Sequence, residues 1–237
     1  MQAIIKNSKL NTKCVVSVTK DRDRIKVMKD NFPKLIPVFP LAGVIYFPKT
    51  NLPLNIFEDR YLQLVNDSMG SNKLMGMIQS KRSSNDLYKI GCLGKINNFK
   101  KNDDGRIFIS LTGITRFEII KEIKNSKLYR EFEVNYERFN IDIKKNEEQI
   151  DNKIDLSKLY KKIKNFFIKN GLVVNWKELE SLDHEEQFNT IAMIAPISNE
   201  EKQTILESVT LYEKIKIINE IIEFYVHEKN EGNVTIQ

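Results

Sequence analysis

Residues 37–61 read PVFPLAGVIYFPKTNLPLNIFEDRY, a proline-punctuated apolar run that stops at a Glu-Asp-Arg cluster. Its prolines each remove a backbone donor and fix φ, so they are typical of strand starts, strand edges and turns. The apolar residues between the prolines therefore predict short buried strands. From Glu58 onward apolar residues recur at spacings of three and four, which predicts a helix over residues 58–69 with acids in its first turn.

Downstream of this run, residues 74–136 show the pattern of strands. Within residues 107–111, isoleucine and leucine alternate with other side chains, as in a strand with one buried face. Residues 101–105 read KNDDG and predict a hairpin loop whose glycine takes a positive φ. Gly113 interrupts a strand and predicts a bulge or a close backbone approach.

The second half of the chain has the period of helices. Residues 156–167 place their apolar side chains on one face, and Gly171 follows where a helix ends. Three later helix starts carry a capping signature: Asp183 with Glu186, Ser198 with Glu201, and Thr210 with Glu213. Helices with one apolar face must bury it, so we expect a helical bundle whose helices pack together or against the strands.

These patterns predict an α+β fold with five segments. We expect a basic extension over residues 1–33, a β-rich subdomain over 34–140, a charged linker over 141–155, a helical subdomain over 156–230 and a tail over 231–237. The 237 residues are 41% hydrophobic and 30% charged, which is ordinary for a globule with a buried core. Because no apolar run approaches the roughly 18 to 20 residues of a membrane helix and no secretory signal is visible, we expect a cytoplasmic protein.

The run over residues 37–61 resembles the opening of the LON domain, the amino-terminal substrate-recognition domain of Lon-type ATP-dependent proteases. That family typically reads P-L-F-P-L, then V-L-F-P, then L-P-L-x-I-F-E-x-R-Y. The matching residues are Pro37, Phe39, Pro40 and Leu41; Val44, Ile45, Phe47 and Pro48; Leu52, Pro53, Leu54, Ile56, Phe57, Glu58, Arg60 and Tyr61. Further ordered matches lie at residues 90–96, 104–106, 113–119, 193–198 and 202–207, so the resemblance covers roughly residues 37–225.

The resemblance implies a PUA-like β pseudo-barrel with one inserted helix, over residues 58–69, followed by the helices. Two departures from the family pattern concern the loop. Lys49 stands where the family usually has glycine, and Asp59 stands where it often has proline.

Several motifs of catalysis are missing from the sequence. None of the nine glycines opens the G-x-x-x-x-G-K-[ST] motif with which an ATPase holds phosphates, and residues 91–95, GCLGK, have the wrong spacing. No peptidase segment with its serine and lysine is visible. Cys14 and Cys92 form no C-x-x-C pair, and His184 and His227 lack a second histidine at metal spacing. We therefore expect no enzymatic activity, no cofactor and no metal; ATP-dependent peptidase activity, which the family name would suggest, conflicts with the missing motifs.

Positive charge is concentrated at the start of the chain. Residues 1–30 hold eight Lys and Arg against three Asp, a net charge of +5, which leaves only +1 of the total +6 for the rest. A basic arm beside a PUA-like barrel keeps RNA binding open as an alternative function, because nucleic-acid binding needs a clustered positive surface. Translation from Met28, which would remove most of this arm, is a second open alternative.

The loop over residues 47–53 is the candidate peptide-binding element. It places Phe47 and Leu52 among the turn-forming Pro48, Lys49 and Pro53, where we expect the two apolar side chains to bury only shallowly. The alternative is that Phe47 and Leu52 plug the barrel.

Four further residues are expected to have structural roles: Glu58, Arg60, Gly113 and Arg116. We interpret the pairs Glu58 with Arg60 and Glu118 with Arg116 as ion pairs or as groups that hydrogen-bond loop carbonyls, because charges inside apolar motifs need partners.

The resemblance implies capture of unfolded or damaged polypeptides. The chain would then be a non-catalytic binding module, an adaptor or accessory in protein quality control, with a separate ATP-dependent protease or a chaperone as its partner. No membrane partner is expected.

Overall fold

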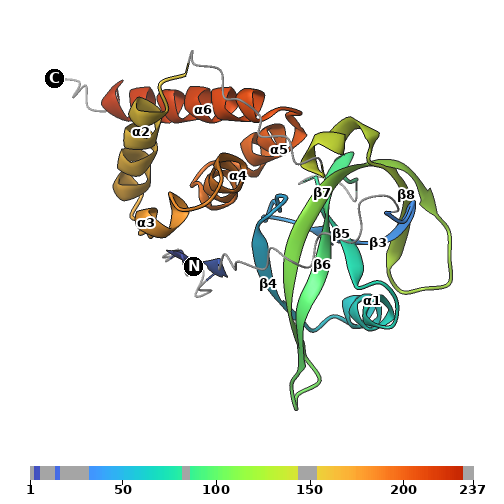
Figure 1. The fold of residues 1–237 in the computed structure, drawn as a ribbon. Coiled ribbons are helices and arrows are strands. Elements are labelled where there is room, and N and C mark those ends of the chain that lie inside the picture. The colour runs from blue at the N-terminus through green and yellow to red at the C-terminus, as the bar shows by residue number, and fades with distance from the viewer. Residues whose placement is uncertain (1–2, 6–13, 17–31, 82–85, 144–153, 232–237) are drawn as a thin grey trace.

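The computed structural model describes residues 3–5, 14–16, 32–81, 86–143 and 154–231 (Figure 1). Most of the predicted extension over residues 1–33, most of the linker over 141–155 and the tail from residue 232 lie outside the described residues. The domain boundaries stay a prediction. A strand-rich part and a group of helices lie side by side, as Figure 1 shows.

Six strands form one mixed sheet. They are β3 (Leu35–Leu41), β4 (Asn51–Ile56), β5 (Leu74–Gln79), β6 (Ile90–Lys101), β7 (Ile107–Ile123) and β8 (Arg130–Asn135). Their order is β4-β7-β6-β5-β3-β8, and β8 also pairs with β7. Five of the strands form a closed ring, because β7 pairs with β6 on one side and with β8 on the other. The pairing of β3 with β5 is parallel, and the other pairings in the ring are antiparallel. This is the barrel-like arrangement that the sequence predicts.

The interior of the ring is filled by one apolar cluster. All five ring strands contribute to it: Ile36, Val38, Leu74, Ile78, Leu93, Phe117, Phe132 and Val134. Gly76 and Gly91 leave room for the Phe117 ring, because a Cβ at Gly76 would lie 2.9 Å and at Gly91 2.6 Å from it. The glycines of β5 and β6 therefore let a phenylalanine occupy the centre of a narrow ring.

Strand β4 lies outside the ring. It pairs with the first half of β7, with Asn51 opposite Thr112 and Ile56 opposite Ile107, and the described strands include no other partner for it. The amide of Gly113 donates to the carbonyl of Thr50 at 2.9 Å, so the backbone N–H and C=O groups of Thr50 and of every second residue after it point toward β7. The backbone groups of Pro53 and Asn55 therefore point away from β7. Proline has no backbone N–H, and at this position β7 loses no hydrogen bond through its absence.

Helices surround this sheet on two sides. The inserted helix α1 (Asp59–Met69) follows β4, within the predicted range. The 3-10 helix η2 (Glu137–Asp142) follows β8. The helical part contains α2 (Leu156–Lys169), α3 (Trp176–Leu179), α4 (His184–Ile194), α5 (Asn199–Glu207) and α6 (Leu211–Glu231). A second apolar cluster runs from β4, β6, β7 and α1 into these helices, so the strands and the helices share one continuous core.

The predicted helix ends are confirmed. Asp183 accepts a hydrogen bond from the amide of Glu186 at the start of α4, and Ser198 forms a full capping box with Glu201. The Thr210 hydroxyl accepts from the amide of Glu213, whose carboxylate accepts from the amide of Thr210. Gly171 has a φ of +72°, which suits the residue after a helix.

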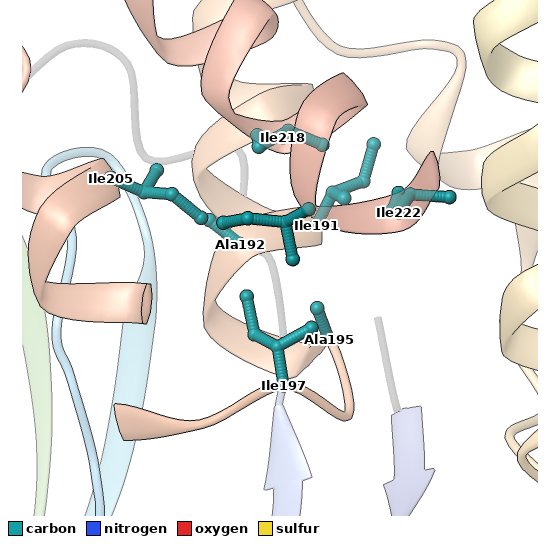
Figure 2. Close-up of a pocket in the computed structure, with 8 residues that line it drawn as sticks. Ile191, Ala192, Ala195, Ile197, Ile205, Ile218 and Ile222 are labelled. Carbon is teal, nitrogen blue, oxygen red and sulfur yellow. The ribbon is translucent and has the colours of Figure 1, made fainter. Parts of the chain in front are cut away.

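A small apolar cavity lies between α4, α5 and α6 (Figure 2). Its volume is about 10 Å³, and isoleucine and alanine side chains line it, among them Ile191, Ala195 and Ile218. A space of this size holds about one water molecule and offers that water no polar partner. The cavity is therefore a packing gap between helices.

Two short strands precede the sheet. Strands β1 (Ala3–Ile5) and β2 (Cys14–Val16) pair antiparallel with each other, with Ile4 opposite Val15. Within the described residues β2 pairs only with β1, although its Cα atoms come within 8 Å of those of β4.

Candidate functional site

The loop before β4 is fixed by contacts with Gly113. The amide of Lys49 donates to the carbonyl of Gly113, and the amide of Gly113 donates to the carbonyl of Thr50, each at 2.9 Å. A Cβ at Gly113 would lie 2.2 Å from the carbonyl oxygen of Phe47, far inside van der Waals contact. The close backbone approach predicted for Gly113 is confirmed. Because glycine has no side chain, the loop backbone can pack directly against β7 at this position.

The candidate peptide-binding residues are mostly buried. Phe47 is 0% and Leu52 2% exposed, and Pro48 is buried as well. The expectation that Phe47 and Leu52 bury only shallowly is wrong, because both belong to the core cluster shared by the strands and the helices. Neither side chain offers surface to a peptide in this conformation. They do not plug the ring either, because the ring interior is filled by a different cluster and Phe47 and Leu52 lie in the core between the strands and the helices.

Lys49 is partly exposed and has a positive φ of +60°. The backbone thus adopts the left-handed conformation at the position where the resembling family usually has glycine. The Lys49 ammonium lies 2.5 Å from a carboxylate oxygen of Glu185 and 3.6 Å from one of Asp183. Burial, the largest single influence, disfavours its charge, but the carboxylates of Glu185, Asp183 and Glu186 together outweigh burial and raise the pKa of Lys49 above its usual value. The side chain ties the loop to the start of α4.

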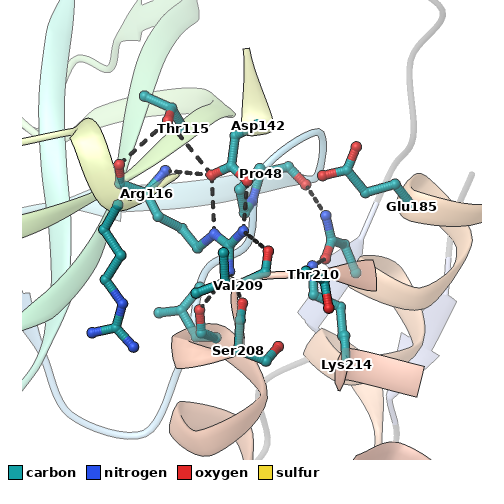
Figure 3. Close-up of polar contacts among 12 residues, drawn as sticks. Pro48, Thr115, Arg116, Asp142, Glu185, Ser208, Val209, Thr210 and Lys214 are labelled. Atoms are coloured by element: carbon teal, nitrogen blue, oxygen red, sulfur yellow. Dashed lines mark hydrogen bonds and ion pairs between the residues drawn. The ribbon is translucent and has the colours of Figure 1, made fainter. Parts of the chain in front are cut away.

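Arg116 joins three parts of the molecule (Figure 3). Its guanidinium forms a two-point ion pair with Asp142 of η2, with Nε to Oδ2 at 3.0 Å and Nη2 to Oδ1 at 2.6 Å, and both side chains are at most 1% exposed. The same guanidinium donates to the carbonyl of Leu206, in the last turn of α5, and to those of Ser208 and Val209, between α5 and α6. Its face stacks on Phe139, 4.3 Å from the ring centre. A single side chain therefore links the ring, η2 and the helices.

The expected pair of Arg116 with Glu118 is wrong. The ion partner of Arg116 is Asp142, and Glu118 lies two positions along β7. The other part of that prediction, hydrogen bonds from Arg116 to loop carbonyls, is confirmed. Asp142 lies near the start of the segment that the sequence predicts to be a charged linker, and nothing in the local pattern distinguishes it from the other acids of that segment.

A second buried polar contact connects the same parts. The Lys214 ammonium of α6 donates to the side-chain oxygen of Asn189 at 2.5 Å, and the Asn189 amide donates to the carbonyl of Pro48 at 3.0 Å. Lys214 is 2% and Asn189 0% exposed. Sequence reasoning missed both residues, since each interrupts an apolar helix face in the way that many solvated residues do. These two contacts hold the loop before β4 against α4 and α6.

The Glu58 and Arg60 pair is confirmed as an ion pair at 2.7 Å, but both side chains are about half exposed. Arg60 also lies over the ring of Tyr61, 4.5 Å from its centre. Such a surface pair contributes little to stability. It fixes the first turn of α1, at the end of β4.

An exposed aromatic surface lies along β4 and the hairpin of β6 and β7. Phe108 is 42% exposed and lies opposite Asn55 on one side and Lys100 on the other. Phe57 is 65% exposed and directly follows buried Ile56, the last residue of β4, which lies opposite Ile107, the neighbour of Phe108. We call Phe57, Phe108 and the strand edge at Pro53 and Asn55 the β4 surface. Sequence analysis missed its two phenylalanines, although their alternation with buried isoleucines was visible.

We searched the described residues for groups of metal ligands and for membrane-spanning helices. Within residues 32–81, 86–143 and 154–231 no group of three or more His, Cys, Asp or Glu side chains is placed to hold a metal ion. In the same part of the chain, no helix is both long and apolar enough to cross a bilayer. Burial, followed by the nearby Asp142 charge, raises the pKa of the Cys92 thiol well above its usual value, so this thiol is a structural group.

A strand ring with an outlying sixth strand, an inserted helix and a closely joined set of helices defines an α+β domain of the type found at the amino terminus of Lon proteases. A Lon N-terminal domain protein from Xanthomonas campestris matches this structure with a TM-score of 0.55 at 18% identity, over 77% of this chain and 95% of that one. The N-terminal domain of the Mycobacterium avium complex Lon protease matches with a TM-score of 0.59 at 15% identity, over 80% and 98%. At such identities the likeness shows the fold alone.

Sequence comparison gives the family. The model of the ATP-dependent protease La (LON) substrate-binding domain matches residues 35–223, so this chain belongs to the LON substrate-binding domain family. Lon protease of Dictyoglomus thermophilum is 23% identical over 200 residues, covering 78% of this chain and 24% of that protein. Lon protease of Desulfosudis oleivorans is 27% identical over 197 residues, covering 79% and 23%. The chain thus spans about a quarter of the length of these relatives, and the match includes their substrate-binding domain only.

Proposed function

We propose that this protein is a non-catalytic module that binds unfolded polypeptides through the β4 surface. Membership of the LON substrate-binding domain family supports a role in substrate recognition. The observation that carries the proposal is the exposure of two phenylalanines: Phe108 of β7, which lies opposite Asn55 of β4, at 42%, and Phe57, which directly follows β4, at 65%. Exposed aromatic side chains near one strand edge are a feature of protein-binding patches.

The geometry suits an extended apolar segment. Beside the two phenylalanines runs the edge of β4, where the carbonyl of Pro53 and the backbone groups of Asn55 point away from β7. Extended peptides add to such edges through main-chain hydrogen bonds while side chains fill apolar contacts. Main-chain recognition is independent of sequence, which is what capture of varied unfolded clients requires.

The remainder of the protein serves to hold this surface rigid. The buried Arg116 and Asp142 pair and the contact of Asn189 with Pro48 fix both the sheet and the loop that leads into β4. We propose that the chain works as an adaptor or accessory in protein quality control, in the cytoplasm, and passes clients to a separate ATP-dependent protease or chaperone. RNA binding stays a prediction, because it depends on the arm over residues 1–30, most of which lies outside the described residues.

Binding to one protein in two states tests the proposal. Fluorescently labelled α-lactalbumin, either native or reduced and carboxymethylated, is titrated with the full chain and followed by anisotropy. We expect saturable binding of the unfolded form and none of the native form. Absence of binding to the unfolded form at tens of micromolar would remove the proposed function.

A further inference from the structure

One face of strands β4, β7 and β6 is open beside the proposed binding edge. Figure 1 shows the long hairpin of β6 and β7 reaching beyond the ring, with β4 next to it. Buried and less buried residues alternate along the first half of β7, so Phe108 and Thr112 share the less buried face. Residues directly opposite on neighbouring antiparallel strands lie on the same face. Phe108 therefore forms a row with Asn55 and Lys100, and Thr112 lies in a second row with Lys95.

This face carries positive charge without acids. Lys100 is exposed and Lys95 partly exposed, and neither ammonium forms an ion pair with another described residue. The acids nearest to Lys100 in sequence are Asp103 and Asp104 in the turn of the hairpin, where Asp104 pairs with Arg106 at 3.3 Å. The other positions in the two rows, and in the row between them, are neutral: Asn51, Pro53, Asn98 and Ser110. The face is therefore suited to a partner with negative charge.

The β4 edge by itself offers few hydrogen bonds. The backbone groups of Pro53 and Asn55 point away from β7, but Pro53 supplies a carbonyl and no amide. Main-chain bonds of this kind also give no preference among clients. In recognition at a strand edge, side-chain contacts provide the specificity, so the neighbouring face decides which segments bind best.

The two lysines are spaced to meet acids on one side of an extended chain. Phe108 and Thr112, which mark their rows, are four residues apart in β7, or about 14 Å. In an extended client, residues i and i+4 point to the same side at the same spacing, with residue i+2 between them. The flexible four-carbon stem of lysine lets each ammonium reach over β7 toward a carboxylate, and Phe108 lies within diagonal reach of an apolar residue at i+2.

We propose that the β4 surface prefers extended client segments in which two acidic residues, four positions apart, flank an apolar residue. This inference rests on the proposed function and names the class of polypeptide that its site selects. Lys95 and Lys100 contact the two carboxylates, and Phe108 contacts the apolar side chain. Two ammonium groups separated by neutral side chains suit such a segment better than a nucleic acid, whose closely spaced phosphates call for a denser positive surface.

The test compares two fluorescently labelled peptides that contain Asp-Thr-Phe-Thr-Asp or Asn-Thr-Phe-Thr-Asn and are otherwise identical. Each is titrated with wild type, with Lys95→Gln/Lys100→Gln and with the control Lys158→Gln/Lys161→Gln, which removes the same charge from exposed positions of α2. We expect wild type and the control to bind the acidic peptide about tenfold more tightly than its neutral twin, as two exposed ion pairs allow. The Lys95 and Lys100 variant should bind the two peptides equally.

Binding of reduced, carboxymethylated α-lactalbumin by wild type separates the two proposals. If wild type binds this protein but the acidic peptide has no advantage, or keeps its advantage in the Lys95 and Lys100 variant, the inference is overturned and the proposed function stands. Absence of binding to α-lactalbumin removes the proposed function and the inference with it. A labelled oligouridylate is the nucleic-acid probe. If the oligouridylate loses affinity in the lysine variant while the two peptides bind equally to wild type, the lysines belong to a nucleic-acid site and the inference is overturned.

Discussion

Arg116 of β7 and Asp142 at the end of η2 form a two-point ion pair that is almost wholly removed from solvent, at 1% and 0% side-chain exposure. The guanidinium also donates hydrogen bonds to three carbonyls where α5 ends and α6 begins, so this pair joins the ring to the helices. Removing one partner of a buried pair leaves an uncompensated charge, which costs far more than the pair contributes.

Arg116→Met should therefore destabilise the protein by about 3–5 kcal/mol in urea unfolding. The matched control is Arg130→Met, since Arg130 forms an equally short pair with Glu122 at 2.6 Å but both side chains are more than a third exposed. We expect the control to cost about 1 kcal/mol or less. Equal losses for the two variants would contradict the assigned role of Arg116.

Gly113→Ala should disturb the loop before β4. The new Cβ would lie 2.2 Å from the backbone carbonyl of Phe47, which cannot move without breaking the contacts of Lys49 and Thr50 with Gly113. We expect a loss of roughly 1–3 kcal/mol in the free energy of unfolding. Gly70→Ala, where the nearest atoms lie at 3.6 Å and φ is −74°, serves as the control and should be nearly neutral.

Two substitutions of Lys49 distinguish the effect of backbone strain from the effect of its charge. Lys49→Gly relieves the φ of +60° but loses the ion pair with Glu185, whereas Lys49→Ala loses the pair and keeps a Cβ in the left-handed conformation. We expect the alanine variant to be less stable than the glycine variant by about 1 kcal/mol in urea unfolding. Equal stability of the two variants would show that the backbone at this position is not strained.

Glu213 should make stability depend on pH below neutrality. The backbone hydrogen bond from Thr210 lowers the pKa of Glu213 below 4.5, its ordinary value. Because the pKa of Glu213 is lower in the folded than in the unfolded protein, the ionised side chain stabilises the fold. This stabilisation is complete above the unfolded-state pKa and is lost as the pH falls through the folded-state pKa. Glu213→Gln should therefore be less stable than wild type at pH 6 and closer to it at pH 3, measured by urea midpoints. Glu220→Gln, at an exposed position that caps no helix, should show no such convergence.

The fold was largely predictable because its signals are local. The alternation in residues 107–111 and the capping pairs such as Ser198 with Glu201 depend on neighbours in sequence, and the structure confirms both. The prolines follow the prediction in part: Pro48 lies in a turn, whereas Pro37 and Pro40 lie inside β3. The left-handed backbone at Lys49 explains why a glycine is usual there.

The site was less predictable because its contacts are distant in sequence. Asp142 is 26 residues from Arg116, and Asn189 is 141 residues from Pro48, so no local sequence pattern predicts either contact. Phe47 and Leu52 looked shallow among turn-formers, yet the helices of the second half cover them. Burial by a remote part of the chain is what local patterns do not encode.

The most direct test of polypeptide capture at the β4 surface is the affinity of Phe57→Ser/Phe108→Ser for reduced, carboxymethylated α-lactalbumin, measured by anisotropy. Both side chains are exposed, so the fold should be kept, and Ile168→Ser/Val173→Ser removes two apolar side chains of equal or greater exposure on the helical part as the control. We predict at least about a tenfold weaker Kd for the phenylalanine variant and an unchanged Kd for the control. An unchanged Kd for the phenylalanine variant, with wild type still binding, would contradict the placement of the site.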